Sequence, residues 1–196
     1  REFGVPPVAE LRQRMEGVQW FVVRDILNLA QAYPLQEISA LIAFALNHEH
    51  PKVRQHAVGL LRNYGRGLAD NLLAQRLEDE DSEVRVAAIR VAAARRSQEC
   101  RAGLEKILTA PDFSERDLRE VKSATAAYAA LVGVSAVPVL DRILNPGLLS
   151  QLRHTDTQVA AAFALASIGP PAKESLLRGT RTLNAKVRDA CRRALE

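Results

Sequence analysis

The segment Asp81–Ala92, which reads Asp-Ser-Glu-Val-Arg-Val-Ala-Ala-Ile-Arg-Val-Ala, most constrains the fold of this chain. When Val84 is taken as position zero, apolar residues stand at +3, +4, +7 and +8, one stripe of a helix with 3.6 residues per turn. Asp81 or Ser82 can cap the free N–H groups of the first turn, and Glu83 suits the positive end of the helix dipole. The segment therefore predicts a capped amphipathic helix.

The same frame recurs along the chain. Its copies begin at residues 23, 53, 84, 121, 159 and 187. A second apolar-periodic segment precedes each copy, at 9–15, 35–46, 68–77, 100–108, 135–144 and 171–178. Helix pairs repeated in this way are typical of an α-solenoid, in which each pair buries its apolar face against its neighbours. We therefore predict an all-α fold of about six helical hairpins.

The repeated Asp-x-x-Val-Arg-x-Ala-Ala pattern resembles HEAT repeats of the short bacterial type across nearly the whole chain. The resemblance implies a right-handed α-solenoid and a single repeat domain over residues 1–196. The copies lie about 28 to 38 residues apart, mostly below the ~40–47 residues usual for HEAT repeats. The helix-pair architecture is therefore a firmer prediction than the subfamily.

Composition sets further bounds. The chain has 196 residues, 47% of them hydrophobic, and lacks a run of 18 apolar residues, so we expect a sizeable core and no membrane insertion. It begins at Arg1 without Met, as a fragment or C-terminal module of a larger bacterial protein would. Cys100 and Cys191 stand far apart in different repeats, which favours two buried thiols over a disulfide. We therefore expect a cytoplasmic location.

Motifs for catalysis or cofactor binding are absent from the sequence, so we expect a non-enzymatic protein without a cofactor. His48, His50 and His56 suggest a metal site, but Pro51 opens a helix among them and no Cys, Asp or Glu completes a ligand set. An enzyme, such as a HEAT-like DNA glycosylase or a phycobilin lyase, would need Asp25 or Cys191 in a concave pocket.

In HEAT-like solenoids the second helix of each pair lines the concave side. The outward positions of these helices are mostly small and apolar here, which favours a protein partner over a phosphate-tracking groove. Burial of the same side chains between neighbouring helices stays open as an alternative. We also expect the connections 110–117 and 145–156 to lie on one edge and to contact the partner. The predicted partner-binding residues are Val58, Arg62, Val86, Ile89, Arg90, Phe113, Leu148, Leu149, Leu152 and Leu165.

Nucleic-acid binding is the alternative function. The net charge is +4, and basic residues gather in repeats two, three and six. Arginine follows the first valine of the frame at 24, 54, 85 and 188, with lysine at 122. These cations form either a ladder for phosphates or internal bonds to carboxylates and carbonyls of the adjacent turn, and the internal role is the favoured interpretation.

Overall fold

The computed structural model describes residues 7–147 and 154–196, whose regular elements are all α-helices or short 3-10 helices. The all-α prediction is therefore confirmed. The chain divides into two compact units, residues 1–91 and 92–196. The single domain over 1–196 and the right-handed winding stay predictions.

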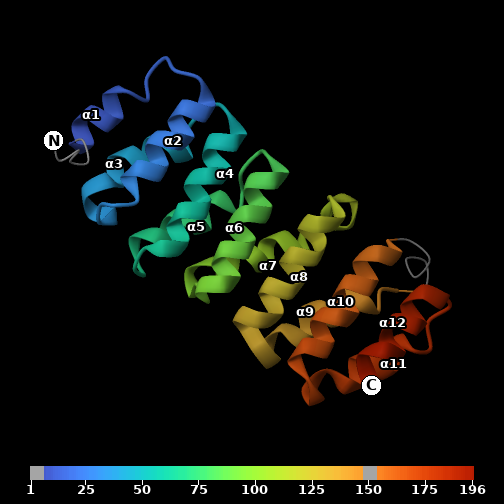
Figure 1. Ribbon diagram of the computed structural model, residues 1–196. Coiled ribbons are helices and arrows are strands. Elements are labelled where there is room, and N and C mark those ends of the chain that lie inside the picture. Colours follow the sequence, from blue (N-terminus) through green and yellow to red (C-terminus); the bar gives the residue numbers. More distant parts are fainter. Residues whose placement is uncertain (1–6, 148–153) are drawn as a thin grey trace. The chain divides into compact units, whose positions relative to one another are not determined.

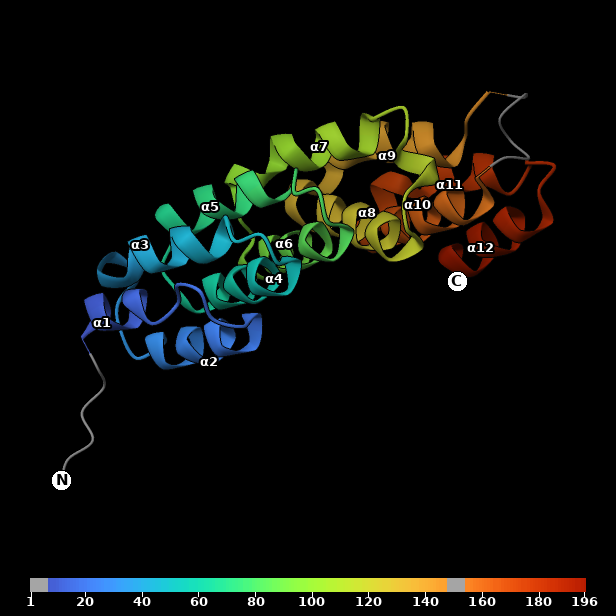
Figure 2. The same ribbon diagram turned by 90° about the horizontal axis from the view of Figure 1, so that it is seen from above.

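The first unit contains the first two hairpins and most of the third (Figure 1). Its helices are α1 (Val8–Gln13), α2 (Trp20–Ala30), α3 (Leu35–Leu46), α4 (Pro51–Leu60), α5 (Leu68–Arg76) and the first part of α6 (Ser82–Arg95), with a 3-10 turn η1 (Leu61–Asn63) after α4. Helix α4 packs against both α2 and α3. In Figure 2, α2 and α4 lie in one layer, and α3 and α5 lie in the other.

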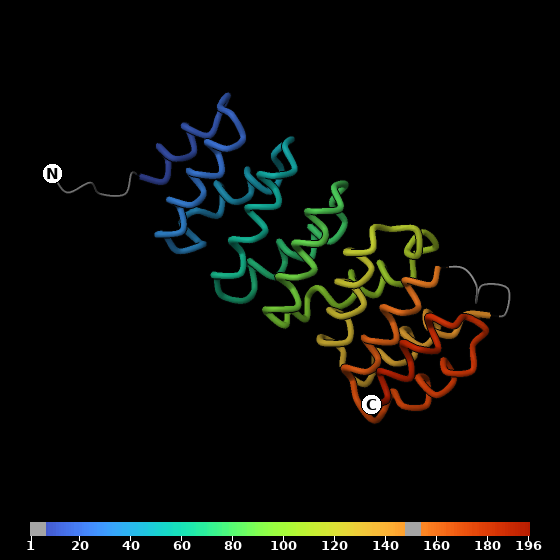
Figure 3. The backbone as a smooth tube through the Cα atoms, turned by 45° about the vertical axis from the view of Figure 1, so that its right-hand side comes forward, coloured from blue at the N-terminus to red at the C-terminus, as the bar shows by residue number. Residues whose placement is uncertain are grey.

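The second unit contains the remaining hairpins, which the tube in Figure 3 traces up and down. Its α-helices are α7 (Arg101–Thr109), α8 (Leu118–Val132), α9 (Val137–Leu144), α10 (Thr155–Ile168), α11 (Lys173–Gly179) and α12 (Ala185–Leu195). Its 3-10 turns are η2 (Gln98–Cys100), η3 (Phe113–Glu115), η4 (Gly133–Ala136) and η6 (Pro170–Ala172). Helix α10 packs against both α8 and α12, and α7 against α8. Helices therefore stand at all twelve predicted places.

The predicted apolar stripe is wrong in one helix, α10. The frame predicts that Val159 and Phe163 are buried, but Val159 is only half-buried and Phe163 is 50% exposed. Gln158 and Leu165 are buried instead, which places the stripe one residue earlier. Alanine fills much of α10 and allows close contact with α8 on one side and α12 on the other, so the bulky ring turns outward.

The recurring arginine makes the same internal contact in three repeats. Nη1 of Arg54 donates to the carbonyl oxygens of residues 48 and 49, each at 2.9 Å. Nη1 of Arg85 donates to those of residues 79 and 80, at 2.8 and 3.0 Å. Nη1 of Arg188 donates to those of residues 182 and 183, at 3.0 and 2.9 Å. Each arginine thus holds the turn that precedes its own helix, six and five residues upstream. We call this contact the arginine clamp.

In the second repeat the clamp also reaches the next turn. Nε and Nη2 of Arg54 donate to the two carboxylate oxygens of Asp79 at 3.0 and 2.9 Å, and Nη2 also donates to Glu80 at 3.0 Å. The side chains of Arg54 and Asp79 are only 6% and 3% exposed. All five guanidinium donors are therefore used inside the first unit. The expected internal contact is thus present in all three arginines, and in Arg54 it leaves no donor for a phosphate.

Residues 118–144 form the one stretch of the described chain that is long and apolar enough to cross a membrane, judged by length and composition. The stretch contains α8, η4 and α9, with Gly133 at a φ of +61° after α8. Helix α8 packs against α7 and α10, and 44% of the apolar window is buried inside the protein. Core helices pass the same test, and the absence of membrane insertion stays a prediction.

Replacing Arg54 by alanine should lower the free energy of unfolding of the first unit by about 3–5 kcal/mol, because the buried Asp79 carboxylate keeps only the more distant Arg76 as a cationic partner. Urea unfolding followed by circular dichroism measures the change. Arg62→Ala is the control, since Arg62 is exposed, and should shift the value by no more than about 0.5 kcal/mol. Equal effects of the two substitutions would contradict the structural role of the clamp.

A second stability prediction concerns Gly179, the last residue of α11. A Cβ atom at this position would overlap Cys191 Sγ of α12 and lie 3.3 Å from a methyl group of Leu144. Gly179→Ala should therefore destabilise the second unit by about 1–3 kcal/mol. In α4, Gly59 has open space around it, and Gly59→Ala should stabilise the first unit by about 0.5–1 kcal/mol. Thermal unfolding of both variants should show a lower midpoint temperature for Gly179→Ala and a higher one for Gly59→Ala than for the wild type.

Candidate functional site

The structure buries each apolar residue predicted to bind a partner that lies within residues 7–147 and 154–196. Five of them are at most 5% exposed: Val58, Val86, Ile89, Phe113 and Leu165. Only Arg62 and Arg90 are on the surface, and Leu148, Leu149 and Leu152 lie outside the described residues. Phe113 was predicted at the edge of the long connections. The groove prediction is therefore wrong for the other four buried side chains, because the chain packs them into its own core. The self-burial alternative holds for them.

The edge with the long connections is partly as predicted. One hollow of about 320 Å³ is lined by Ser114, Arg116, Leu118 and Val121 and by His154–Thr157, so the described end of the second connection lies beside the first. Phe113 is buried beneath η3, and Arg116 forms ion pairs with Asp112 and Glu120 at 3.2 and 2.8 Å. The first connection is therefore a packed element of the second unit. Partner contact at this edge stays a prediction.

One candidate site lies in the first unit. It is a cleft of about 960 Å³, bounded by α1, the turn from α1 to α2, α3, and the turn from α3 to α4. We call it the aromatic cleft. It is lined by Arg12, Met15, Gly17, Val18, Gln19, Trp20, Ala40, Ala43, Phe44, Asn47, His48, Glu49 and His50.

Ring contacts fix the walls of the aromatic cleft. The indole of Trp20 stacks on the imidazole of His50, with centroids 5.0 Å apart and planes 12° from parallel. The guanidinium carbon of Arg12 lies 4.3 Å from the centroid of Phe44, a cation–π contact. Phe44 in turn meets His48 edge to face at 5.9 Å. Three helices and two turns thus contribute to one cleft, in which apolar side chains lie beside polar and charged ones.

The histidines act as acceptors in the turn between α3 and α4. Nδ1 of His48 accepts from the backbone N–H of His50 at 3.0 Å, and Nδ1 of His50 accepts from that of Lys52 at 3.2 Å. His56 stands apart, with Nε2 2.9 Å from Asn28 Oδ1. Its burial, and then the nearby Arg24, lower the pKa of His56. The three imidazoles therefore serve local structure, and no group of three metal-ligating side chains occurs within residues 7–147 and 154–196.

A second, smaller hollow adjoins the aromatic cleft at Trp20. Its volume is about 360 Å³, and we call it the basic hollow. It is lined by Trp20, Arg24, Lys52, Gln55, His56, Gly59 and Leu60. Arg24 bonds to Asp25 at 2.8 and 3.0 Å, whereas Lys52 Nζ has only a 3.5 Å contact with Gln55 Oε1. Trp20 is thus a wall of both sites.

Trp20 and Phe21 are the first two residues of α2. In the structure Trp20 stacks on the second hairpin, and Phe21 is 46% exposed beside it, with ring centroids 6.1 Å apart. The aromatic cleft was missed because Arg12, Trp20, Phe44 and His50 come from four separate elements. The single tryptophan of the chain was the only signal of the cleft in the sequence.

The two groups that would indicate an enzyme are not placed for catalysis. Asp25 is exposed and paired with Arg24, and Cys191 is fully buried. Neither residue lines the aromatic cleft or the basic hollow. The geometry of both sites therefore fits binding.

Comparison with protein families matches residues 38–124 to HEAT repeats, which is somewhat less than half of the chain. The comparison with curated proteins gave no match. The family match and the repeated hairpins make the chain a helical repeat protein.

Solved structures with a similar backbone include engineered proteins. One engineered protein is 20% identical over 97% of this chain and 95% of its own, with a TM-score of 0.48. A designed armadillo repeat protein is 15% identical over 96% and 98%, with a TM-score of 0.43. Another designed armadillo repeat protein, solved in complex with the peptide (KR)4, is 16% identical over 96% and 90%, with a TM-score of 0.46.

Burial raises the pKa of the Cys191 thiol to about 11, from a usual value of 9.0. Native protein at pH 8 should therefore react with iodoacetamide at Cys191 at least about a hundredfold more slowly than urea-unfolded protein. The shift also predicts that the contribution of Cys191 to stability is constant below about pH 9 and falls between about pH 9 and 11, as the unfolded thiol ionises first. Peptide mass spectrometry measures the alkylation. Rapid labelling of Cys191 in the native state would show that the thiol is accessible.

Proposed function

We propose that this helical repeat protein is a non-enzymatic interaction module that binds a segment of a partner protein in the aromatic cleft. The observation that carries the proposal is an open apolar cleft with two aromatic walls, Trp20 and Phe44, on the surface of the first unit. HEAT repeats are typical of protein-binding scaffolds, whose stacked hairpins offer extended surfaces.

The openness of the cleft favours a protein segment over a small molecule. Small-molecule sites enclose most of the ligand surface. Here Gln19, Ala40, Asn47 and Glu49 are all exposed although they line the cleft. A bound chain could therefore lie along the cleft and leave it at either side, with one or two side chains against the rings.

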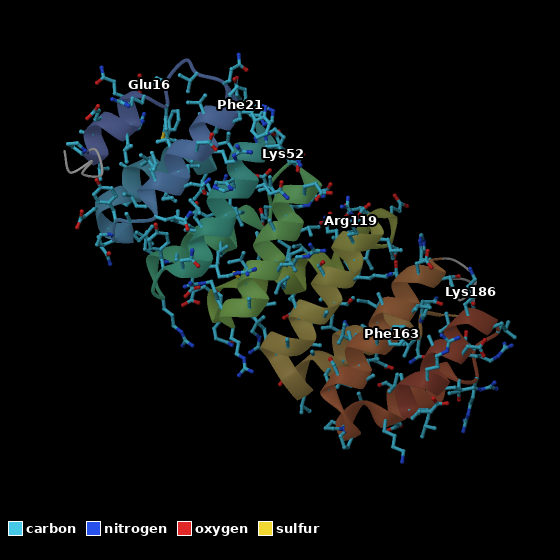
Figure 4. All side chains as sticks on the ribbon, viewed as in Figure 1. Glu16, Phe21, Lys52, Arg119, Phe163 and Lys186 are labelled. Carbon is cyan, nitrogen blue, oxygen red and sulfur yellow. The ribbon has the colours of Figure 1, made fainter. Side chains whose placement is uncertain are left out.

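Exposed apolar residues extend this surface at the start of α2. Val18, just before the helix, and Phe21, in its first turn, are 38% and 46% exposed. Large apolar side chains gathered near a cleft are typical of interaction surfaces. Figure 4 shows Phe21 and Lys52 at the same end of α2 and α4, beside the two sites.

Two finer points complete the proposal. The edge at 110–117 and 145–156 serves as a second contact for the same partner, and the protein acts in the bacterial cytoplasm. The two buried free cysteines support a reducing compartment.

The test uses a displayed library of random 12-residue peptides, selected on the intact chain. Peptides from this library should bind the wild type and lose at least about tenfold in affinity for Trp20→Ala, because buried aromatic anchors dominate such contacts. Isothermal titration calorimetry measures the affinities. Trp20, the only tryptophan, also reports occupancy of the cleft by its fluorescence.

Phe163→Ala is the matched control, since Phe163 is a 50% exposed aromatic residue of the second unit (Figure 4). It should leave peptide affinity unchanged, and circular dichroism should show that both variants stay folded. The proposal fails if no peptide is enriched, or if the enriched peptides bind Trp20→Ala as tightly as the wild type.

A further inference from the structure

The charges of the basic hollow are unevenly balanced. Arg24 and Lys52 line it, and its lining contains no carboxylate. Arg24 is partly neutralised by Asp25, but no carboxylate lies within 4.0 Å of Lys52 Nζ in the described part of the chain. The hollow therefore presents one ion-paired and one unpaired cation.

The local backbone adds to this positive potential. Lys52 is the second residue of α4, so its ammonium group lies at the positive end of the helix dipole. The half-buried His56 on the next turn has a lowered pKa and adds no charge near pH 7. Gly59 leaves the floor open, because nothing lies within 4 Å of the place its Cβ would occupy.

The hollow and the aromatic cleft share the indole of Trp20, which joins an apolar subsite to a cationic one. Both lie within reach of a short extended segment, since each extended residue spans about 3.3–3.6 Å. A partner segment with an apolar side chain in the cleft would thus place a side chain about one to three residues away over the hollow.

We propose that the basic hollow selects partner segments that carry a carboxylate side chain next to the apolar residue held in the aromatic cleft. The occupant is a linear protein segment with an Asp or Glu one to three residues from an aromatic or large aliphatic residue. Lys52 is the main recognition group and Arg24 the second. This inference rests on the proposed function, because it assigns the specificity of the same site.

A nucleic acid would use the same cations differently. Binding to a phosphate backbone needs several cations in a row, and single strands also stack their bases on aromatic residues. The two sites together offer Arg12, Arg24 and Lys52, with Glu49 also lining the cleft. Three dispersed cations beside an acidic residue favour a single carboxylate over a run of phosphates.

The experiment compares three versions of a peptide selected from the 12-residue library, with Glu, Gln or Lys at the acidic position. The intact wild-type chain should bind the Glu version about fivefold more tightly than the Gln version and should bind the Lys version most weakly. Lys52→Glu should reverse the order, so that the Lys version binds most tightly. Arg24→Gln should reduce the difference in affinity between the Glu and Gln versions of the peptide.

Lys186→Glu is the matched control. Lys186 is likewise the second residue of its helix, and its backbone N–H also donates to the capping side chain, that of Asn184 at 3.1 Å (Figure 4). This variant changes the net charge as Lys52→Glu does, but in the second unit, and should keep the wild-type order of the three peptides. A reversal in both variants would reflect net charge and would overturn the inference.

The outcomes separate the two proposals. If peptides bind in a Trp20-dependent way but the wild type does not distinguish Glu from Gln, the selectivity inference is wrong and the proposed function stands. If no Trp20-dependent peptide exists, both are wrong. Twelve-residue oligo-dT is the nucleic-acid probe. If it binds at 150 mM salt in a Lys52-dependent way and displaces the peptide, the hollow takes phosphates, and the carboxylate assignment is overturned.

Discussion

The arginine clamp is the interaction on which the hairpin geometry depends. A guanidinium has five donors in a rigid plane, and Arg54 uses them on two turns of successive repeats. Backbone carbonyls in a turn need donors when helices cover them. The clamp supplies those donors from the helix that follows, so the same residue that marks the start of a helix also fixes the turn before it.

The clamp also links the fold to the candidate site. The carbonyls that Arg54 holds belong to His48 and Glu49, and both residues line the aromatic cleft. The next residue, His50, carries the ring on which Trp20 stacks. Asp79, far along the sequence, orients Arg54 through two hydrogen bonds. A buried ion pair in one part of the unit therefore holds a wall of the cleft in another.

Much of the fold could be predicted from the sequence because each helix is marked by a short pattern of residues that are close together in the chain. A valine followed by arginine, with alanines three and four residues later, defines a buried stripe, and the helices stand where this pattern places them. The predicted buried stripe was wrong in α10, because alanines on several faces remove the contrast between buried and exposed positions. Phe163 therefore faces outward there. The prediction of an apolar groove on the inner face was also wrong. Val58 and Leu165 are as apolar as a groove would require, but they are buried in the core of the protein.

The candidate site was less predictable for a physical reason. Trp20 and His50 stack across two turns that are thirty residues apart, and no periodic pattern encodes such a contact. The sequence suggested the histidines only as a metal site, and no pattern in it connected them with the tryptophan. Their shared surface appears only when the turns are placed side by side.

The most direct measurement of the central claim is amide hydrogen exchange across residues 47–52 in the wild type and in Asp79→Asn. The backbone N–H groups of His50 and Lys52 bond to imidazole nitrogens inside the turn that Arg54 holds. The account predicts faster exchange at these amides in the variant, with exchange in the second unit unchanged. Wild-type exchange rates at His50 and Lys52 in a folded Asp79→Asn protein would contradict it.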